Sequence, residues 1–139
     1  SLSPLVGQFP DSGSAPAKLI GTGEYSLGVS YIHALAKYKA EGFNVKMIAP
    51  PKTVGDVDCI SIMKNTNNLS AAQKFVDFML SKEAQELMSS IDFTIPVNPD
   101  AKGVDGVVPV SNLDLIDYDV NKASVQKDEV LKKWAEEVK

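Results

Sequence analysis

The chain has 139 residues, of which 44% are hydrophobic and 23% charged, so it has the composition of a folded protein and is long enough to bury one core. Its 14 basic and 18 acidic residues give a formal net charge of −4, and no predicted helix carries a basic stripe. A nucleic-acid or anionic-membrane partner is therefore disfavoured, and no apolar run approaches the roughly 20 residues that cross a bilayer.

The first elements are an irregular segment and a short helix. Residues 1–16 are rich in Ser, Pro and Gly and predict irregular structure, apart from a short strand at Leu5–Val6. Ser12-Gly13-Ser14 supplies N-cap residues, and Pro16 follows in the first turn. This pattern predicts a helix over residues 15–21 whose amino terminus carries unpaired amide donors.

Residues 24–49 predict a strand, a helix and a second strand. Large and small residues alternate over 24–31, which favours a strand. Tyr31, Leu35 and Tyr38 then recur at helical spacing, with Gly42 placed as a left-handed C-cap. Residues 44–49 predict a buried strand. Such a unit is typical of a parallel sheet with a crossover helix.

The rest of the chain alternates between apolar segments and helices. After Pro50-Pro51, residues 57–63 are apolar on both faces, as in a strand covered on each side. A capping box at Ser70 predicts a helix with an apolar stripe from Ala72 to Leu80, and a second helix starts at Ser81. A short strand over 107–113 and a terminal helix over 126–138 complete the prediction.

Three blocks of this sequence occur together in one known family. They are Gly23-Glu24 before the small-residue strand, Pro51 and Gly55 before Ile60-Ser61-Ile62-Met63-Lys64, and residues 72–85, which read Ala-Gln-Lys-Phe-Val-Asp-Phe-Met-Leu-Ser-Lys-Glu-Ala-Gln. Over residues 12 to 100 the chain resembles the bacterial extracellular solute-binding proteins that include the ferric-iron binders. The last block is the most specific, but its residues do structural work: Phe75 and Phe78 wedge a helix onto the sheet, and Ser81 caps the next helix.

The resemblance implies an α/β fold of the type II periplasmic-binding-protein class, present here as an incomplete, carboxyl-terminal part of a two-lobe protein. Residues 1–50 are expected in the second lobe, residues 51–59 in the lobe crossing, and residues 60–139 in the carboxyl-terminal part of the first lobe. The chain itself begins without the pattern of an export signal. The family nevertheless implies a periplasmic or other extracytoplasmic location.

The candidate ligand-binding residues are Ser12, Gly13, Ser14, Ser30, Tyr31 and Asp56. The serine turn could hold an anion or a polar oxygen, or could simply cap its helix. Ser30 and Tyr31 end a predicted strand, where open α/β sheets place their ligands. Asp56, with Asp58, flanks the lobe crossing and could meet a ligand or belong to a solvated turn.

A metal site is a further hypothesis. The iron-binding members of the family are expected to use adjacent tyrosines here, whereas this sequence has Tyr31-Ile32-His33. Tyr31 and His33 could reach a hard metal together with a carboxylate from elsewhere, although residues i and i+2 of a helix do not share a face. His33 could equally be a polar surface residue.

The sequence carries no catalytic motif and implies no cofactor. Its one cysteine, Cys59, lies in an apolar strand and is expected to be a buried, inert thiol. We therefore expect a non-enzymatic solute-capture component of an ABC importer for iron, anions or another small polar solute, which delivers its ligand to a membrane permease. A cytosolic enzyme or ligand-sensing domain of the same fold is the alternative. We also expect association with the missing amino-terminal half or with a second copy.

Overall fold

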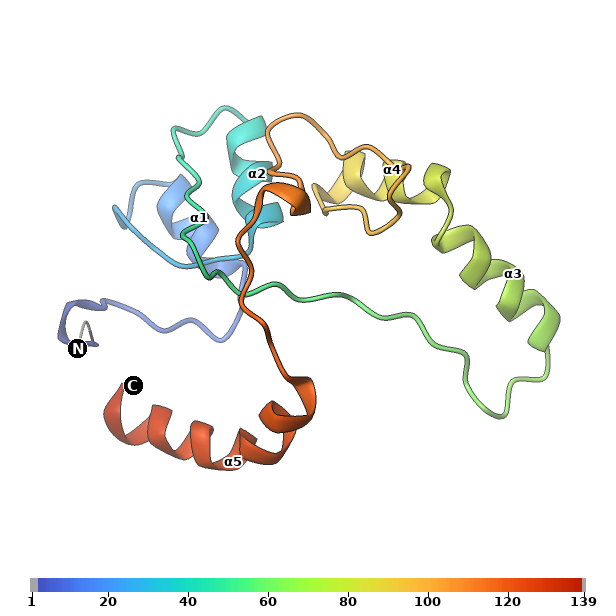
Figure 1. Ribbon diagram of the computed structural model, residues 1–139. Helices are drawn as coiled ribbons and strands as arrows, with labels where there is room; N and C mark the ends of the chain where they lie inside the picture. The colour runs from blue at the N-terminus through green and yellow to red at the C-terminus, as the bar shows by residue number, and fades with distance from the viewer. Residues whose placement is uncertain (1–2, 139) are drawn as a thin grey trace.

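The structure is a computed structural model that describes residues 3–138, so Ser1, Leu2 and Lys139, at the ends of the expected lobe segments, lie outside the described residues. Its elements are, in order, η1 (Ser3–Leu5), α1 (Ala15–Gly21), α2 (Ile32–Ala40), α3 (Leu69–Met79), α4 (Lys82–Asp92), η2 (Val110–Asn112) and α5 (Val120–Glu137). Figure 1 shows α1, α2 and α4 grouped together, with α3 on an extended arm and α5 apart from that group. None of the described helices is long and apolar enough to span a membrane.

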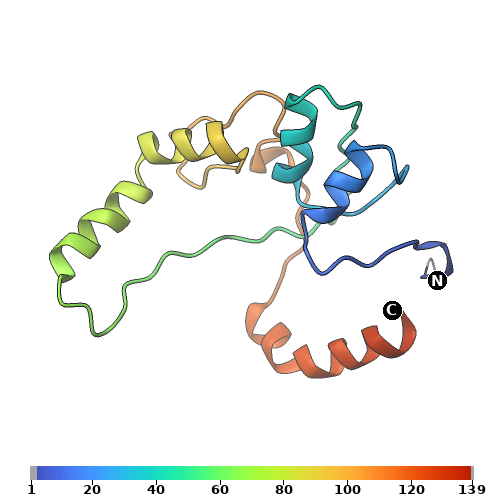
Figure 2. The same cartoon turned by 180° about the vertical axis from the view of Figure 1, so that it is seen from behind.

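The first two helices form where the sequence predicts them. Helix α1 spans Ala15–Gly21 with Pro16 in its first turn, where a missing amide costs nothing. Helix α2 ends at Ala40, and Gly42 follows with a φ of +89°, the left-handed conformation that glycine adopts without steric cost. The two helices pack against each other, as both views show (Figures 1 and 2).

The later helices confirm one predicted cap and correct two boundaries. Ser81 Oγ accepts a hydrogen bond from the Ala84 amide at 3.2 Å, which caps α4 as expected. The expected capping box at Ser70 is wrong, because Asn68 caps α3 and places Ser70 inside the helix. The terminal helix also begins earlier than predicted, at Val120, because Asp119 accepts from the Lys122 amide at 3.0 Å.

The predicted strands do not form within the described residues. Segments 24–31, 44–49 and 57–63 run without regular pairing, Leu5 belongs to η1, and η2 replaces the strand expected over 107–113. A strand forms when a neighbour pairs with its backbone, and these segments have no neighbour in register. The helices of the expected α/β fold are therefore present without its sheet among residues 3–138.

One short parallel pairing joins distant parts of the chain. Thr53 and Leu115 form an isolated bridge, in which the Thr53 amide donates to the Asp114 carbonyl and the Ile116 amide donates to the Thr53 carbonyl, both at 3.0 Å. Beside it, Lys52 Nζ lies 3.0 Å from Asp114 Oδ1. Thr53 lies within the expected lobe crossing and Leu115 in the segment expected in the first lobe, but the division into lobes stays a prediction.

The hydrophobic core is small and lies around α2, which packs against α1 and also contacts α4. Its buried apolar residues are Ala17, Ala34, Ala36, Val45 and Ala84. Larger side chains remain outside it. Phe75 and Phe78 are 56% and 47% exposed, so the expected wedge onto a sheet is absent, and the Cys59 thiol is exposed instead of buried. In both cases the covering layer that the sequence pattern anticipates is missing.

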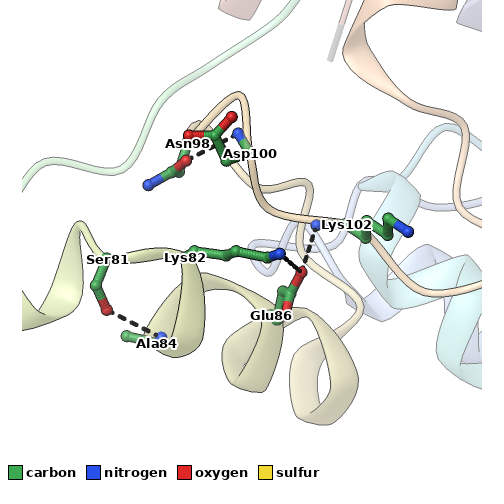
Figure 3. A network of polar contacts seen from close by, with 7 residues as sticks. All are labelled: Ser81, Lys82, Ala84, Glu86, Asn98, Asp100 and Lys102. Carbon is green, nitrogen blue, oxygen red and sulfur yellow. Dashed lines mark hydrogen bonds and ion pairs between the residues drawn. The ribbon is translucent and has the colours of Figure 1, made fainter.

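Side chains of α4 hold the loop that follows it. Gln85 Oε1 accepts from the Val97 amide at 2.9 Å, Glu86 Oε1 from the Lys102 amide at 3.1 Å, and buried Ser89 Oγ from the Val104 amide at 3.2 Å. Figure 3 shows the Glu86 contact beside the Ser81 cap. Three backbone donors of a loop without secondary structure are thereby satisfied, which holds residues 97–104 along the helix.

Candidate functional site

Most of the predicted ligand-binding residues meet at the amino-terminal ends of α1 and α2. Ser30 Oγ donates a hydrogen bond to the Gly13 carbonyl at 2.8 Å, although 17 positions separate the two residues. The hydroxyls of Ser12 and Ser14 lie 3.1 Å apart, at the turn that enters α1. The packing of α1 on α2 brings these two helix starts together (Figures 1 and 2). The sequence predicted the serine turn and Ser30-Tyr31 as two separate candidate positions, and the fold brings them into contact.

Tyr31 packs its ring directly on this turn. A Cβ atom built on Gly13 would lie 2.3 Å from Tyr31 Cε2 and 3.0 Å from its phenol oxygen, so the ring occupies the space that any other residue would fill. Tyr31 remains 55% exposed. Its phenol therefore lies at the surface, next to Gly13.

His33 joins the cluster by stacking on Tyr31. Their ring centroids are 5.3 Å apart and the rings are inclined by 14°. The expectation that these residues could not share a face is wrong. Tyr31 is the N-cap residue of α2, with φ −67° and ψ 142°. Its backbone is extended and not helical, so the rule for which residues of a helix share a face does not apply to it. We call Ser12, Gly13, Ser14, Ser30, Tyr31 and His33 the α1–α2 cluster.

Asp56 is not tied to this cluster. It lies just after the Thr53–Leu115 bridge, and its Oδ1 accepts from the Val57 amide at 2.9 Å. Within residues 3–138 no hydrogen bond or ion pair connects Asp56 or Asp58 to the α1–α2 cluster. The carboxylate therefore shapes its own turn, and its predicted contact with ligand stays untested.

The metal hypothesis has two potential ligands in place. Tyr31 and His33 lie next to each other, but no group of three His, Cys, Asp or Glu side chains suited to a metal occurs in the described part of the chain. A hard metal needs several oxygen or nitrogen ligands, so this pair would need further ligands. The pair by itself is half of a coordination sphere at most.

The cluster has the chemistry of a binding surface for a polar solute. Its serine hydroxyls both donate and accept hydrogen bonds, its phenol adds another such group, and its rings offer an apolar face. The Ser12 and Ser14 hydroxyls are exposed and bonded to each other, an arrangement that a solute oxygen can replace without leaving a buried group unpaired. Plain capping does not account for the turn, because Ser14 makes no side-chain cap bond.

Sequence reasoning missed the polar contacts of α4. Gln85 is the last residue of the most specific block of the sequence, which was interpreted only as helix packing and capping, and Glu86 follows it. The structure shows that they also hold the following loop through its amides. A signal was available: side-chain acceptors on a helix, followed by a loop rich in Pro and Gly whose amides have no regular partners.

Comparison with known proteins gives two matches. Residues 6–108 match the family model described as bacterial extracellular solute-binding protein. The chain is also similar to a protein of Haemophilus influenzae, described as an uncharacterized protein, with 34% identity over 143 aligned residues. That alignment covers 99% of this chain and 41% of the relative, so the chain spans about two fifths of the relative's length.

Proposed function

Because the chain belongs to the bacterial extracellular solute-binding protein family, we propose that it forms one wall of a binding site that captures a small polar or anionic solute, or a metal, for import. The observation that carries the proposal is the α1–α2 cluster. Gly13 lies 17 positions before Ser30, yet it contacts both Ser30 and the adjacent Tyr31 at the surface. Hydrogen-bonding groups that converge beside an exposed aromatic ring are typical of small-molecule sites.

The proposed role is transport without catalysis. The solute enters between two lobes, the lobes close over it by a hinge, and the closed form is presented to the permease of an ABC importer. Such a role belongs outside the cytoplasm, in the periplasm or another extracytoplasmic location. The second wall of the site comes from the amino-terminal half of the protein or from a second copy, since the cluster is open to solvent on this chain.

The experiment that tests this proposal is a ligand screen in two formats. Thermal unfolding is followed with metal ions, phosphate esters and small organic acids, and the same compounds are titrated into 15N-labelled protein. We expect one class to shift the amide resonances of Gly13, Ser30 and Tyr31. A solute at about 100 times its Kd adds roughly 2.7 kcal/mol of apparent stability, because it binds the native state.

Variants separate binding at the cluster from binding elsewhere. Ser30→Ala removes the hydroxyl that contacts the Gly13 carbonyl and should weaken binding by about 3- to 10-fold, as expected for one hydrogen bond. Ser26→Ala is the matched control, because Ser26 is an exposed serine of the same connecting segment that lies outside the cluster. If no compound class moves the cluster resonances, or if both variants bind alike, the proposed site is wrong.

A further inference from the structure

The distance between α1 and α2 decides whether the α1–α2 cluster forms. Small residues are buried on both helices: Ala17 on α1, and Ala34 and Ala36 on α2. The size of the side chains at a contact sets how near two packed helices lie. Ser30 Oγ reaches the Gly13 carbonyl only at the separation that the two helices have here.

Gly21, the last residue of α1, contacts Tyr38 of α2 without a side chain of its own. A Cβ atom built on Gly21 would lie 2.9 Å from Tyr38 Cδ1 and 3.2 Å from its Cγ. These are ring atoms near the α2 backbone, so they cannot yield as the free end of a long side chain can. The Tyr38 ring also meets the Phe43 ring edge to face, with centroids 5.4 Å apart. The second ring restricts where Tyr38 can move.

The backbone at Gly21 does not itself require glycine. Gly21 lies within α1 and has no positive φ. Alanine fits such a position and normally favours a helix. What alanine lacks at position 21 is space against Tyr38, so the helix-to-helix contact is the reason that glycine suits this position.

A displacement at Gly21 carries to the other end of α1. The helix has 7 residues, which makes it roughly 10 Å long, and it ends at the serine turn of the cluster. A Cβ at 2.9 Å from Tyr38 Cδ1 has to move to at least 3.4 Å, a shift of about 0.5 Å. The Ser30–Gly13 bond is 2.8 Å long and is lost beyond about 3.5 Å, so a shift of this size is enough to weaken it.

We propose that Gly21 is a positioning residue for the α1–α2 cluster. Its missing side chain lets α1 lie against Tyr38 at the depth where Gly13 meets Ser30 and Tyr31. The inference rests on the proposed function of the cluster as a solute site. It adds a residue outside the cluster that fixes the geometry in which the hydroxyls and the phenol meet a solute.

Gly28 provides a matched control. A Cβ atom on Gly28 would lie 2.8 Å from Ile20 Cδ1, a clash as close as the one at Gly21. Ile20 Cδ1 is the end of a flexible side chain and can rotate away. Gly28 is also nearer to Ser30 in sequence than Gly21 is, so a general disturbance of this region would affect the cluster at least as much in Gly28→Ala.

The test uses the full chain without any solute. The carbonyl carbon resonance of Gly13 reports on its hydrogen bond from Ser30, and Ser30→Ala gives the position for a lost bond. Gly21→Ala should move this resonance at least about half of the way to that position, because bonded and open forms average in proportion to their populations. Nuclear Overhauser contacts between Gly13 and the Tyr31 ring should weaken as well. Gly28→Ala should leave both signals in place, and circular dichroism should show the helix content retained in each variant.

A double variant separates the contact with Tyr38 from a local effect on α1. In a Tyr38→Ala background the ring atoms that meet position 21 are gone, so adding Gly21→Ala should no longer move the Gly13 resonance. If Gly21→Ala does not fold, Tyr38→Trp enlarges the same contact from the α2 side and should move the resonance in the same direction.

Three results would overturn the proposal: an unmoved Gly13 resonance in Gly21→Ala, an equal displacement in Gly28→Ala, or an effect of Gly21→Ala that persists in the Tyr38→Ala background. Each of these outcomes is read without a ligand. A failed ligand screen would therefore count against solute capture and leave the positioning role standing, whereas an unmoved resonance would refute the positioning role alone.

Discussion

Tyr31 lies over Gly13, and its ring fills the space that a side chain at position 13 would occupy. A Cβ atom there would come within 2.3 Å of Tyr31 Cε2, well inside the contact distance of two carbon atoms. The same glycine presents its carbonyl to Ser30 Oγ at 2.8 Å. One residue without a side chain thus supports both the aromatic ring and the hydroxyl of the α1–α2 cluster.

We predict that Gly13→Ala displaces the Tyr31 ring with little loss of stability. Tyr31 is 55% exposed, so its ring can rotate into solvent and the backbone need not move. The change should cost about 1 kcal/mol or less in the free energy of unfolding, as for a surface side chain that changes its rotamer. Nuclear Overhauser contacts between residue 13 and the Tyr31 ring should disappear, and solute affinity should fall.

Gly7→Ala is the control for that change. A Cβ on Gly7 would lie 2.5 Å from Tyr25 Cε1, a comparable clash with a tyrosine outside the cluster. It should disturb the Tyr25 ring and leave solute affinity intact. Equal loss of affinity in the two variants would mean that Tyr31 does not contribute to binding through this contact.

A second prediction concerns the loop held by α4. Ser89 is fully buried, and its Oγ accepts from the Val104 amide at 3.2 Å. Ser89→Ala leaves that amide without a partner, which should cost about 1–3 kcal/mol. Hydrogen exchange at Val104 should quicken. In Ser90→Ala, which removes an exposed hydroxyl bonded to the Leu87 carbonyl, exchange at Val104 should be unchanged.

The Thr53–Leu115 pairing should depend on its backbone bonds more than on its ion pair. The side chains of Lys52 and Asp114 are 73% and 52% exposed, so Lys52→Met should change the free energy of unfolding by less than about 1 kcal/mol. Thr53→Pro removes the amide that donates to the Asp114 carbonyl and should separate the two segments. If spin-label distances showed that residues 53 and 115 separate in Lys52→Met, the ion pair would matter more to the pairing than the backbone bonds, contrary to the prediction.

The helices were predictable because their signals are local. Pro16 and Gly42 mark the start of one helix and the end of the next, and Ser81 caps a third through an amide three residues away. Where two local signals competed, the prediction was wrong: Asn68 and Ser70 are both good N-caps, and Asn68 takes the position. Such choices depend on backbone geometry that composition does not reveal.

The absence of the sheet and the contacts of the α1–α2 cluster could not be predicted from local sequence alone. The 57–63 segment has strand-like residues but no partner among the described ones, and a strand exists only as half of a pair. The candidate residues of the cluster were predicted as two separate positions, while their contact through Ser30 and Gly13 depends on how α1 packs on α2. The stacking of His33 on Tyr31 was not predicted, because the rule that residues i and i+2 of a helix do not share a face does not apply to Tyr31, which is the N-cap residue.

The last prediction concerns α5, which contacts the first part of the chain. Trp134 meets Phe9 edge to face with ring centroids 5.7 Å apart, and Ser3 Oγ donates to the Val138 carbonyl. Trp134 is the one tryptophan of the sequence, so its fluorescence reports on this contact. Phe9→Ala should release α5 and shift the Trp134 emission to longer wavelength. The free energy of unfolding should fall by about 0.5–1.5 kcal/mol for the lost aromatic pair, in addition to the effect of the apolar area that the pair buries. Val125→Ala, on an 87% exposed position of the same helix, should leave the emission unchanged. An unchanged spectrum in Phe9→Ala would show that other contacts hold α5 in place.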